Sequence, residues 1–402
     1  MLNRRNLLLA GSAFVTLPAN AQQHRPPAHP RRKPGVPEAA VGAPGTTPLG
    51  PLDSAARFAI VTDYATGATL LDKDADVQMP PSSMTKLMTA YIVYAMLKAG
   101  RLTLTQELPV SERAWRMQGS KMFVPYPGSV KVEDLIRGMI IQSGNDACIV
   151  LAEAIAGSEE QFVEQMNKQA AEMGLTNTHF ATCTGWPDPT QHMSVRDIAT
   201  LSAHIIRDYP QYYHYDREVS FKYNGIEQQN RNSLVQKGIA DGLKTGHTEA
   251  GGYGLVASSE RGGRRVIVVV NGCTSMHQRA EEAERLLEWS FREFENVTLF
   301  SAADTVETVK VWLGTQPTVP LVGGRDLVIT MPRAWRNSAK IEVQYAAPIT
   351  APVSRGDPLG KLVVSGKGVP GMTVPLLAGA DVGRAGLPAR AAAVLGHYVL
   401  GT

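Results

Sequence analysis

The chain has 402 residues, a formal net charge of +3 and 44% hydrophobic residues. This length allows two or three domains with a sizeable core, and the composition is ordinary for a globular protein. The small net charge and the lack of a basic cluster argue against a nucleic-acid-binding surface. The sequence also contains no H-E-x-x-H motif of a zinc peptidase.

The N-terminus has the pattern of an export signal. Arg4 and Arg5 precede an apolar run over residues 7–17, and Ala-Asn-Ala at residues 19–21 fits a cleavage site. The apolar run is too short to span a bilayer, so a cleaved signal peptide over residues 1–21 is favoured over a membrane anchor. The arginine pair also resembles a twin-arginine signal, which leaves the export route open.

Residues 22–53 predict a linker. They are rich in proline, glycine and alanine and show no apolar period, which is typical of an extended and mobile segment. A solvated tether is favoured over an arm that binds an anionic polymer.

The three cysteines are Cys148, Cys183 and Cys273. An exported chain can form disulfides, and an odd number of cysteines leaves at least one unpaired in a monomer. Their spacing does not suggest a metal site.

Residues 54–297 predict one domain in which strands and helices are intermixed. In chain order we expect two strands around a turn at 65–67, a helix over 83–100, two helices separated by a break at 142–145, an amphipathic helix over 158–175, two strands around a turn at 262–263 and a long helix over 279–296. This mixture predicts the α+β class.

After residue 297 the pattern changes. Strand-like runs separated by glycine and proline replace the helical periodicity, and residues 298–385 predict a separate β domain. The tail, residues 386–402, can form a short helix from Pro388 with Leu395 on its apolar face. It lacks the basic face of a membrane anchor, so we expect weak or no contact with a membrane surface.

The run PPSSMTKLMTA at residues 80–90 combines a helix start with a candidate nucleophile. Prolines followed by serine suit the first turn of a helix. Residues three apart on a helix are neighbours, so Lys86 can reach the Ser83 hydroxyl. A serine needs a base to act as a nucleophile, and a lysine with a lowered pKa can supply one. Taken alone, however, S-x-x-K is a weak signal, and a solvated helix lysine is the favoured interpretation.

Two further short motifs follow in the chain. Ser-Gly-Asn at residues 143–145 lies at the expected break between two helices, and Lys-Thr-Gly at residues 244–246 opens an expected strand. Alone, the first motif would be read as a turn. All three motifs in this order rarely arise by chance, and their expected positions are a helix start, an interhelical loop and a strand edge.

With these motifs the chain resembles the low-molecular-weight penicillin-binding proteins, which are serine-type D-alanyl-D-alanine carboxypeptidases. The longer runs LIRGMIIQSGNDAC, QQNRNSLV, DGLKTGHTEAGGYGLVAS and GLTNTHF strengthen the resemblance. It covers roughly residues 58–296 and continues more loosely into the β domain. It implies a β-lactamase/transpeptidase-like catalytic domain, with an antiparallel sheet and helices, followed by a small all-β C-terminal domain.

The resemblance implies roles for four catalytic residues. Ser83, at a helix N-terminus where the dipole favours negative charge, would attack the carbonyl between the two terminal D-alanines and form an acyl-enzyme. Lys86 must be neutral to accept the proton, and burial together with nearby Lys244 would lower its pKa. By the family pattern, Ser143 relays a proton to the leaving amine and Asn145 holds the substrate amide.

Recognition of a free C-terminus requires a cationic site. The resemblance assigns this role to Lys244, Thr245 and Gly246 of the Lys-Thr-Gly motif, with Arg231 as a partner that can grip a carboxylate through two hydrogen bonds. The alternative for Arg231 is an ordinary surface arginine.

The resemblance also implies an oxyanion hole formed by the backbone N–H groups of Ser83 and His247. The side chain of His247 is expected to contribute packing. No metal or organic cofactor is needed. The implied partners are peptidoglycan stem peptides ending in D-Ala-D-Ala and β-lactams, which mimic that dipeptide. The implied location is the periplasm.

Three alternatives remain at this point. A class A β-lactamase would need a glutamate that positions the deacylating water, and residues 183–194 contain none. A D,D-endopeptidase of the same superfamily would cut cross-links, although smaller endopeptidases lack the β domain. A non-catalytic sensor of muropeptides or antibiotics would not need the intact nucleophile and base.

Overall fold

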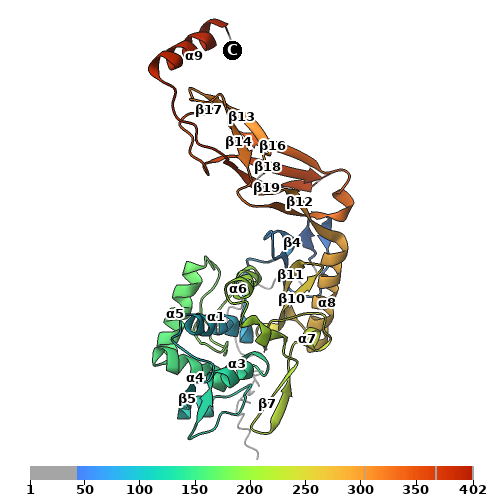
Figure 1. Ribbon diagram of the computed structural model, residues 1–402. Coiled ribbons are helices and arrows are strands. Elements are labelled where there is room, and N and C mark those ends of the chain that lie inside the picture. The colour runs from blue at the N-terminus through green and yellow to red at the C-terminus, as the bar shows by residue number, and fades with distance from the viewer. Residues whose placement is uncertain (1–42, 303, 367–368, 401–402) are drawn as a thin grey trace, which may run out of the picture. The chain divides into compact units, whose positions relative to one another are not determined.

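The computed structural model describes residues 43–302, 304–366 and 369–400 (Figure 1). The expected signal peptide and residues 22–42 of the expected linker lie outside this part of the chain. Of the helices described, none is both long enough and apolar enough to cross a membrane.

The N-terminal part, over residues 45–293, is built on a seven-stranded sheet in the order β2-β1-β4-β3-β11-β10-β9, in which all neighbouring strands are antiparallel. Its strands are β1 Gly45–Thr47, β2 Gly50–Leu52, β3 Phe58–Asp63, β4 Thr69–Lys73, β9 Thr245–Thr248, β10 Gly252–Arg261 and β11 Arg264–Cys273. The strand pairs expected around residues 65–67 and 262–263 are confirmed. Strand β9 lies at the edge of the sheet.

Strands β1 and β2 lie within the segment expected to be a linker, so residues 45–52 differ from that expectation. They form a small hairpin in which the Thr47 hydroxyl donates to the Gly50 carbonyl, and Thr46 pairs with Asp72 of β4. Pairing with an existing strand edge supplies the backbone hydrogen bonds that the composition alone does not predict.

Helices cover both faces of this sheet. The helices of this part are α1 Lys86–Lys98, α2 Glu112–Arg116, α3 Val132–Ile140, α4 Asn145–Ala156, α5 Glu159–Glu172, α6 Val195–Asp208, α7 Ser233–Gln236 and α8 Met276–Glu293, with 3-10 turns η1 Ser82–Thr85 and η2 Tyr213–Arg217. Of these, α6 and α8 pack directly on the strands, on opposite faces of the sheet. Two short hairpins complete this part: β5 Glu107–Pro109 with β6 Ser129–Lys131, and β7 Ser220–Tyr223 with β8 Ile226–Gln229.

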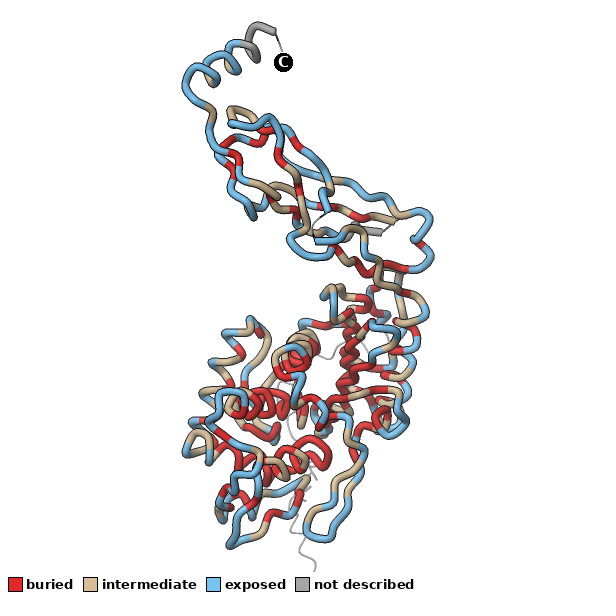
Figure 2. Tube along the Cα trace, in the orientation of Figure 1, coloured by how far each residue is buried: buried red, intermediate tan, exposed pale blue. Residues whose placement is uncertain are grey.

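Strand β11 shows why both faces are covered. Its residues alternate between two apolar clusters: Ile267 and Val269 face the cluster formed with α1, α3, α4 and α6, whereas Val266 and Val268 face the cluster formed with α8. Figure 1 shows α8 alongside β10 and β11. Buried residues gather in these central helices and along the strands (Figure 2). The α+β class expected from the sequence is confirmed.

The C-terminal part contains mainly strands. β12 Phe294–Phe300 pairs with β15 Leu327–Pro332, and a six-stranded sheet has the order β16-β18-β19-β14-β13-β17. Its strands are β13 Glu307–Trp312, β14 Thr318–Val322, β16 Lys340–Tyr345, β17 Ile349–Thr350, β18 Pro358–Gly366 and β19 Val369–Ala378, and the 3-10 turn η3 Arg333–Trp335 follows β15. The expected all-β architecture is confirmed, and helix α9 Leu387–Leu400 follows it.

One boundary differs from the expected one. The long helix was expected to reach residue 296, but α8 ends at Glu293 and β12 begins at Phe294. Phe294 is fully buried in the cluster between the seven-stranded sheet and α8, while Asn296 already pairs with Thr330 of β15. The backbone therefore changes from helix to strand at Phe294, where the side chain enters the core.

Candidate active site

Ser83 and Lys86 lie at the start of the first long helix. Ser83 is in the 3-10 turn η1 and Lys86 begins α1, so their side chains are on one face, and the Lys86 Nζ lies 2.9 Å from the Ser83 Oγ. Nζ also lies 2.7 Å from the Asn145 Oδ1 and 2.5 Å from the Thr184 carbonyl oxygen. Lys86 is only 1% exposed. The solvated helix lysine is therefore not what the structure contains.

These partners of Lys86 suit a neutral amine. A neutral amine has two N–H donors and one lone pair, and the oxygens of Asn145 and Thr184 can take the two hydrogens. The lone pair is then left for the Ser83 hydroxyl proton. Burial lowers the pKa of Lys86, and the charge of Arg231 lowers that pKa further.

Lys244 immediately precedes edge strand β9. Its ammonium is buried, and its hydrogen bond is to the Thr245 carbonyl oxygen at 3.0 Å. Burial lowers the pKa of Lys244 well below its usual value, and Lys86, Arg231 and Arg279 lower that pKa further. Within the described part of the chain, neither Lys86 nor Lys244 is within ion-pair distance of a carboxylate. The site therefore has an excess of positive potential suited to an anionic ligand.

The Ser-Gly-Asn motif lies between α3 and α4. Ser143 has a positive φ of 60°, and its buried Oγ has no hydrogen-bond partner among the described residues. A strained backbone and an unsatisfied buried hydroxyl are both features of functional sites. Asn145 donates through Nδ2 to the Gln118 carbonyl oxygen and through its backbone N–H to the Ser120 carbonyl oxygen. It thus connects residues 118–120 to Lys86.

The Lys-Thr-Gly motif packs its backbone against η1. A Cβ placed on Gly246 would lie 3.0 Å from the Ser82 Cβ and 3.3 Å from the Ser83 backbone nitrogen. Glycine at this position allows β9 to approach the nucleophile closely. Thr245 is buried, while His247 is exposed and stacks on Tyr253 with ring centroids 3.9 Å apart.

Arg231 lies on the side of the site formed by residues 118–120. Its guanidinium is exposed, and Nη1 donates to the Ser120 Oγ at 2.6 Å. The structure thus joins Ser83, Lys86 and Asn145 by direct hydrogen bonds and links Arg231 to Asn145 through Ser120.

The segment around Gly185 was missed in the sequence analysis. The Thr184 carbonyl accepts a hydrogen bond from Lys86, and Gly185 has a φ of 79° where its backbone touches Ser82. A backbone carbonyl carries no signature in residue type, so no motif could have revealed this contact. A glutamate from α5, Glu159, also reaches this segment, but its carboxylate is occupied by the Cys183 N–H and by Arg113.

Asp146 supports the same side of the site. Its buried carboxylate accepts the backbone N–H groups of Met122, Phe123, Val124 and Ala147. An Asp146→Asn variant would turn an N–H toward at least one of these donors and leave it unsatisfied. We expect a loss of about 2–4 kcal/mol in unfolding free energy and a fall in Tm of about 5–10 °C, measured by calorimetry.

The control for this prediction is Glu164→Gln, which makes the same chemical change at an exposed position of α5. It should leave Tm within about 1 °C of the parent value, because exposed substitutions rarely matter. Equal Tm values for the two variants would contradict the role given to Asp146.

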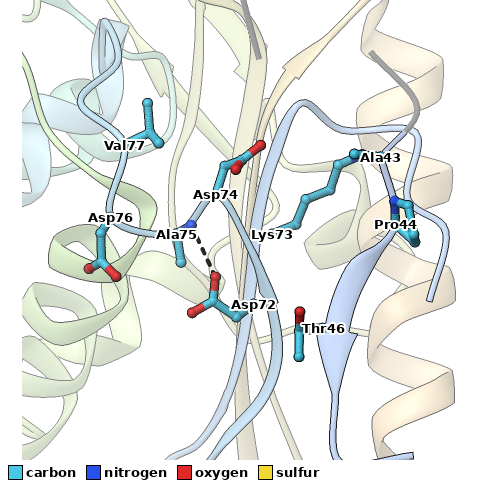
Figure 3. A pocket seen from close by; sticks show the side chains of 9 residues that line it. All are labelled: Ala43, Pro44, Thr46, Asp72, Lys73, Asp74, Ala75, Asp76 and Val77. Atoms are coloured by element: carbon cyan, nitrogen blue, oxygen red, sulfur yellow. Dashed lines mark hydrogen bonds between the residues drawn. The ribbon is translucent and has the colours of Figure 1, made fainter. Parts of the chain in front are cut away.

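A separate hollow of about 430 Å³ is lined by residues 43–46, by the end of β4 and by the turn after β4 (Figure 3). None of the predicted site residues lines it. Two of its carboxylates, Asp72 and Asp76, pair with Arg196, and Asp72 also accepts the Ala75 N–H. These groups are satisfied within the protein.

The three cysteines are all buried and free, so no disulfide is present. Burial raises the pKa of Cys148 and of Cys273 to about 12, and raises that of Cys183 well above its usual value. Over the described ranges, no group of three or more His, Cys, Asp or Glu side chains is arranged to hold a metal ion.

Comparison with known families gives two matches along the chain. Residues 45–275 match the family of D-alanyl-D-alanine carboxypeptidases, and residues 294–384 match the C-terminal domain of penicillin-binding protein 5. The chain is 41% identical over 316 residues to the D-alanyl-D-alanine carboxypeptidase DacC of Escherichia coli, which covers 76% of this chain and 79% of that protein.

Solved structures agree with these matches. Penicillin-binding protein 5 from Haemophilus influenzae aligns with a TM-score of 0.77 and 38% identity, covering 82% of this chain and 98% of that one. Penicillin-binding protein D2 from Listeria monocytogenes, in an ampicillin-bound form, aligns with a TM-score of 0.54 and 28% identity over 59% of this chain and 98% of that one.

Proposed function

The chain belongs to the D-alanyl-D-alanine carboxypeptidase family, and from that premise we propose how its residues divide the steps of the reaction. It is a serine peptidase that removes the terminal D-alanine from peptides ending in D-Ala-D-Ala. The observation that carries the assignment of residues is the contact of 2.9 Å between the Lys86 Nζ and the Ser83 Oγ, inside a buried set of partners.

Acylation begins with proton transfer from Ser83 to Lys86. The Ser83 Oγ attacks the carbonyl carbon of the penultimate D-alanine while the lone pair of Lys86 accepts its proton. The negative charge then develops on the former carbonyl oxygen. The backbone N–H groups of Ser83 and His247 stabilise it, a role supported by the close packing of Gly246 against the Ser83 nitrogen.

Collapse of the tetrahedral intermediate breaks the C–N bond. The leaving amine of D-alanine takes a proton through the Ser143 hydroxyl, and the absence of a hydrogen-bond partner for its Oγ in the described part of the chain supports this role. Asn145, fixed by Gln118 and Lys86, holds the amide of the acyl group. Water then hydrolyses the ester on Ser83 and releases the shortened peptide.

Lys244, Thr245 and Arg231 bind the terminal carboxylate of the substrate. Two of them are cations that lack an ion-paired carboxylate among the described residues, so a substrate carboxylate meets an uncompensated positive site. β-Lactams enter by the same route, and their acyl-enzyme is expected to be long-lived. Glu159 cannot serve as the deacylating base while Cys183 and Arg113 occupy its oxygens.

We place the enzyme in the periplasm, acting on peptidoglycan stem peptides, on the basis of the export signal and the family. Helix α9 exposes Leu387 and Leu395 and carries Arg390 as its only arginine or lysine. It therefore binds a membrane surface weakly at most.

The test of this function is mass spectrometry of the purified mature protein with diacyl-L-Lys-D-Ala-D-Ala and, separately, with penicillin. Loss of one D-alanine together with a slowly decaying penicilloyl adduct is the expected result. Rapid penicillin turnover without D-alanine release would indicate a β-lactamase instead. An adduct without release would indicate an endopeptidase or a sensor.

The rate constant of acylation is expected to rise with pH through the pKa of Lys86 and then to level off, because only the neutral amine accepts the proton. Burial and Arg231 lower this pKa, so the rising limb lies below the value of 10.5 for an exposed lysine. An Arg231→Met variant loses one of the charges that lower the pKa of Lys86, so the rising limb of its rate profile should move to higher pH. The measurement is the second-order rate constant with a fluorescent penicillin across the pH range.

The matched control for this shift is Arg116→Met, which removes an exposed arginine that pairs with Glu112 on α2. Its midpoint should equal that of the parent enzyme. A rate that falls with pH, or an Arg231→Met midpoint that does not move, would contradict the assignment of Lys86 as the base.

A further inference from the structure

Arg279 is a buried arginine that no motif pointed to. It lies in the first turns of α8, is 6% exposed, and has no carboxylate within ion-pair distance among the residues described. Burial lowers its pKa to about 10, so it stays protonated at neutral pH. A buried cation without an anionic partner is costly, and such a group persists mainly where it has a function.

The hydrogen bonds of Arg279 go to the backbone of the catalytic strand. Nη1 donates to the Gly246 carbonyl oxygen at 3.1 Å and reaches the Gly254 carbonyl oxygen of β10 at 3.5 Å. The guanidinium carbon also lies 5.7 Å from the ring centroid of Tyr253, and that ring stacks on the His247 ring. Arg279 is therefore held beneath β9, directly under the Lys-Thr-Gly motif.

The peptide bond between Gly246 and His247 connects this cation to the active site. In a planar trans peptide the carbonyl and the N–H point in opposite directions. The Gly246 carbonyl points inward, toward β10 and Arg279. The N–H of His247 therefore points away from β10, at the free edge of the sheet. The adjacent Gly246 packs against η1, and a Cβ placed on it would lie 3.3 Å from the Ser83 backbone nitrogen.

We propose that Arg279 is a positioning residue that polarises the Gly246–His247 peptide and so makes the His247 N–H a stronger donor in the oxyanion hole. A hydrogen bond from a cation to the carbonyl draws electron density from the amide and increases the positive charge on its N–H. Donors of this kind contribute most when charge develops on the substrate oxygen. The inference rests on the proposed role of the His247 N–H.

A different role for Arg279 predicts a different outcome. If Arg279 acted by attracting the substrate carboxylate, its loss would slow acylation only by substrates that carry a terminal carboxylate. If it polarises the oxyanion hole, its loss slows acylation by every acyl donor. An activated ester of diacyl-L-Lys-D-Ala, which has no terminal carboxylate, separates the two roles.

The experiment compares Arg279→Met and Arg279→Lys with the parent enzyme. We expect Arg279→Met to lower the acylation rate constant about ten- to a hundredfold for both the ester and the D-Ala-D-Ala peptide. Arg279→Lys keeps the charge and should recover part of the loss. The control is Arg292→Met, near the end of the same helix, where the arginine is exposed and pairs with Glu293.

The second readout is the infrared carbonyl stretch of the acyl-enzyme on Ser83. A weaker oxyanion hole polarises the ester carbonyl less, so the band should move to higher wavenumber in Arg279→Met and remain unchanged in Arg292→Met. Only folded, acylated protein gives this band, so misfolding cannot produce the shift. An unmoved band, or a loss confined to the carboxylate-bearing substrate, would overturn the proposal. Failure of the parent enzyme to acylate at Ser83 would instead overturn the proposed function.

Discussion

Replacing Ser83 by alanine is expected to end both D-alanine release and formation of the penicilloyl adduct. In the proposed mechanism the Ser83 Oγ forms the acyl bond, and the Lys86 Nζ lies 2.9 Å from it. Loss of a serine nucleophile lowers kcat by about 10⁴-fold or more in serine peptidases. Mass spectrometry of the intact protein after exposure to penicillin, together with an assay of free D-alanine, measures both effects.

Substrate binding should survive this change, because Lys244 and Arg231 remain in place. The neighbouring hydroxyl offers a matched control: the Ser82 Oγ is 3.1 Å from the Thr248 Oγ1 and is not among the hydrogen-bond partners of Lys86. Ser82→Ala should therefore still form the adduct. An adduct on Ser83→Ala would show that another residue is the nucleophile.

Replacing Gly185 by alanine is expected to slow acylation about a hundredfold without touching a catalytic side chain. A Cβ on Gly185 would lie 1.8 Å from the Ser82 carbonyl oxygen, and its φ of 79° is unfavourable for alanine. The clash is with backbone, so the segment that carries Thr184 must move away from η1. Displacements of about 1 Å at a reacting group can cost 10²-fold in rate.

A glycine with the same backbone strain but open surroundings controls for strain alone. Gly174 has a φ of 71°, and a Cβ there would meet no heavy atom within 4 Å. Gly174→Ala should lose some stability but acylate at the parent rate. The rate constant with a fluorescent penicillin and the Tm of both variants make the comparison. Equal acylation by the two variants would show that the Thr184 carbonyl does not hold Lys86 in a productive position.

Much of the architecture was predictable because each element carries its own pattern. The valines of β11 and the periodic apolar residues of α3 indicate one strand and one helix before any tertiary contact is known. The strands in residues 45–52 could not be predicted in this way, because they depend on pairing with β4 rather than on their own composition. The predicted end of α8 was wrong for a related reason, because burial of Phe294 and pairing with β15 outweigh helical propensity.

The candidate site divides in the same way. The side chains to which we assign chemical roles, such as Ser83, Lys86 and Lys244, could be found in the sequence because their types and order form motifs. The groups that hold them were not, because the Thr184 carbonyl and the Gly185 contact are backbone features. Arg279 belongs with these, since an arginine in a polar helix start looks like any solvated residue until its burial is known.

The three free cysteines can report local unfolding of the catalytic part. Cys148 and Cys183 lie in the apolar cluster between the sheet and helices α1, α3, α4 and α6, Cys273 lies in the cluster beneath α8, and the C-terminal strands contain no cysteine. Buried thiols of raised pKa do not react with alkylating reagents until the cluster around them opens. The labelling rate of each cysteine therefore measures local unfolding of its own cluster, without any engineered cysteine and with no signal from the C-terminal domain.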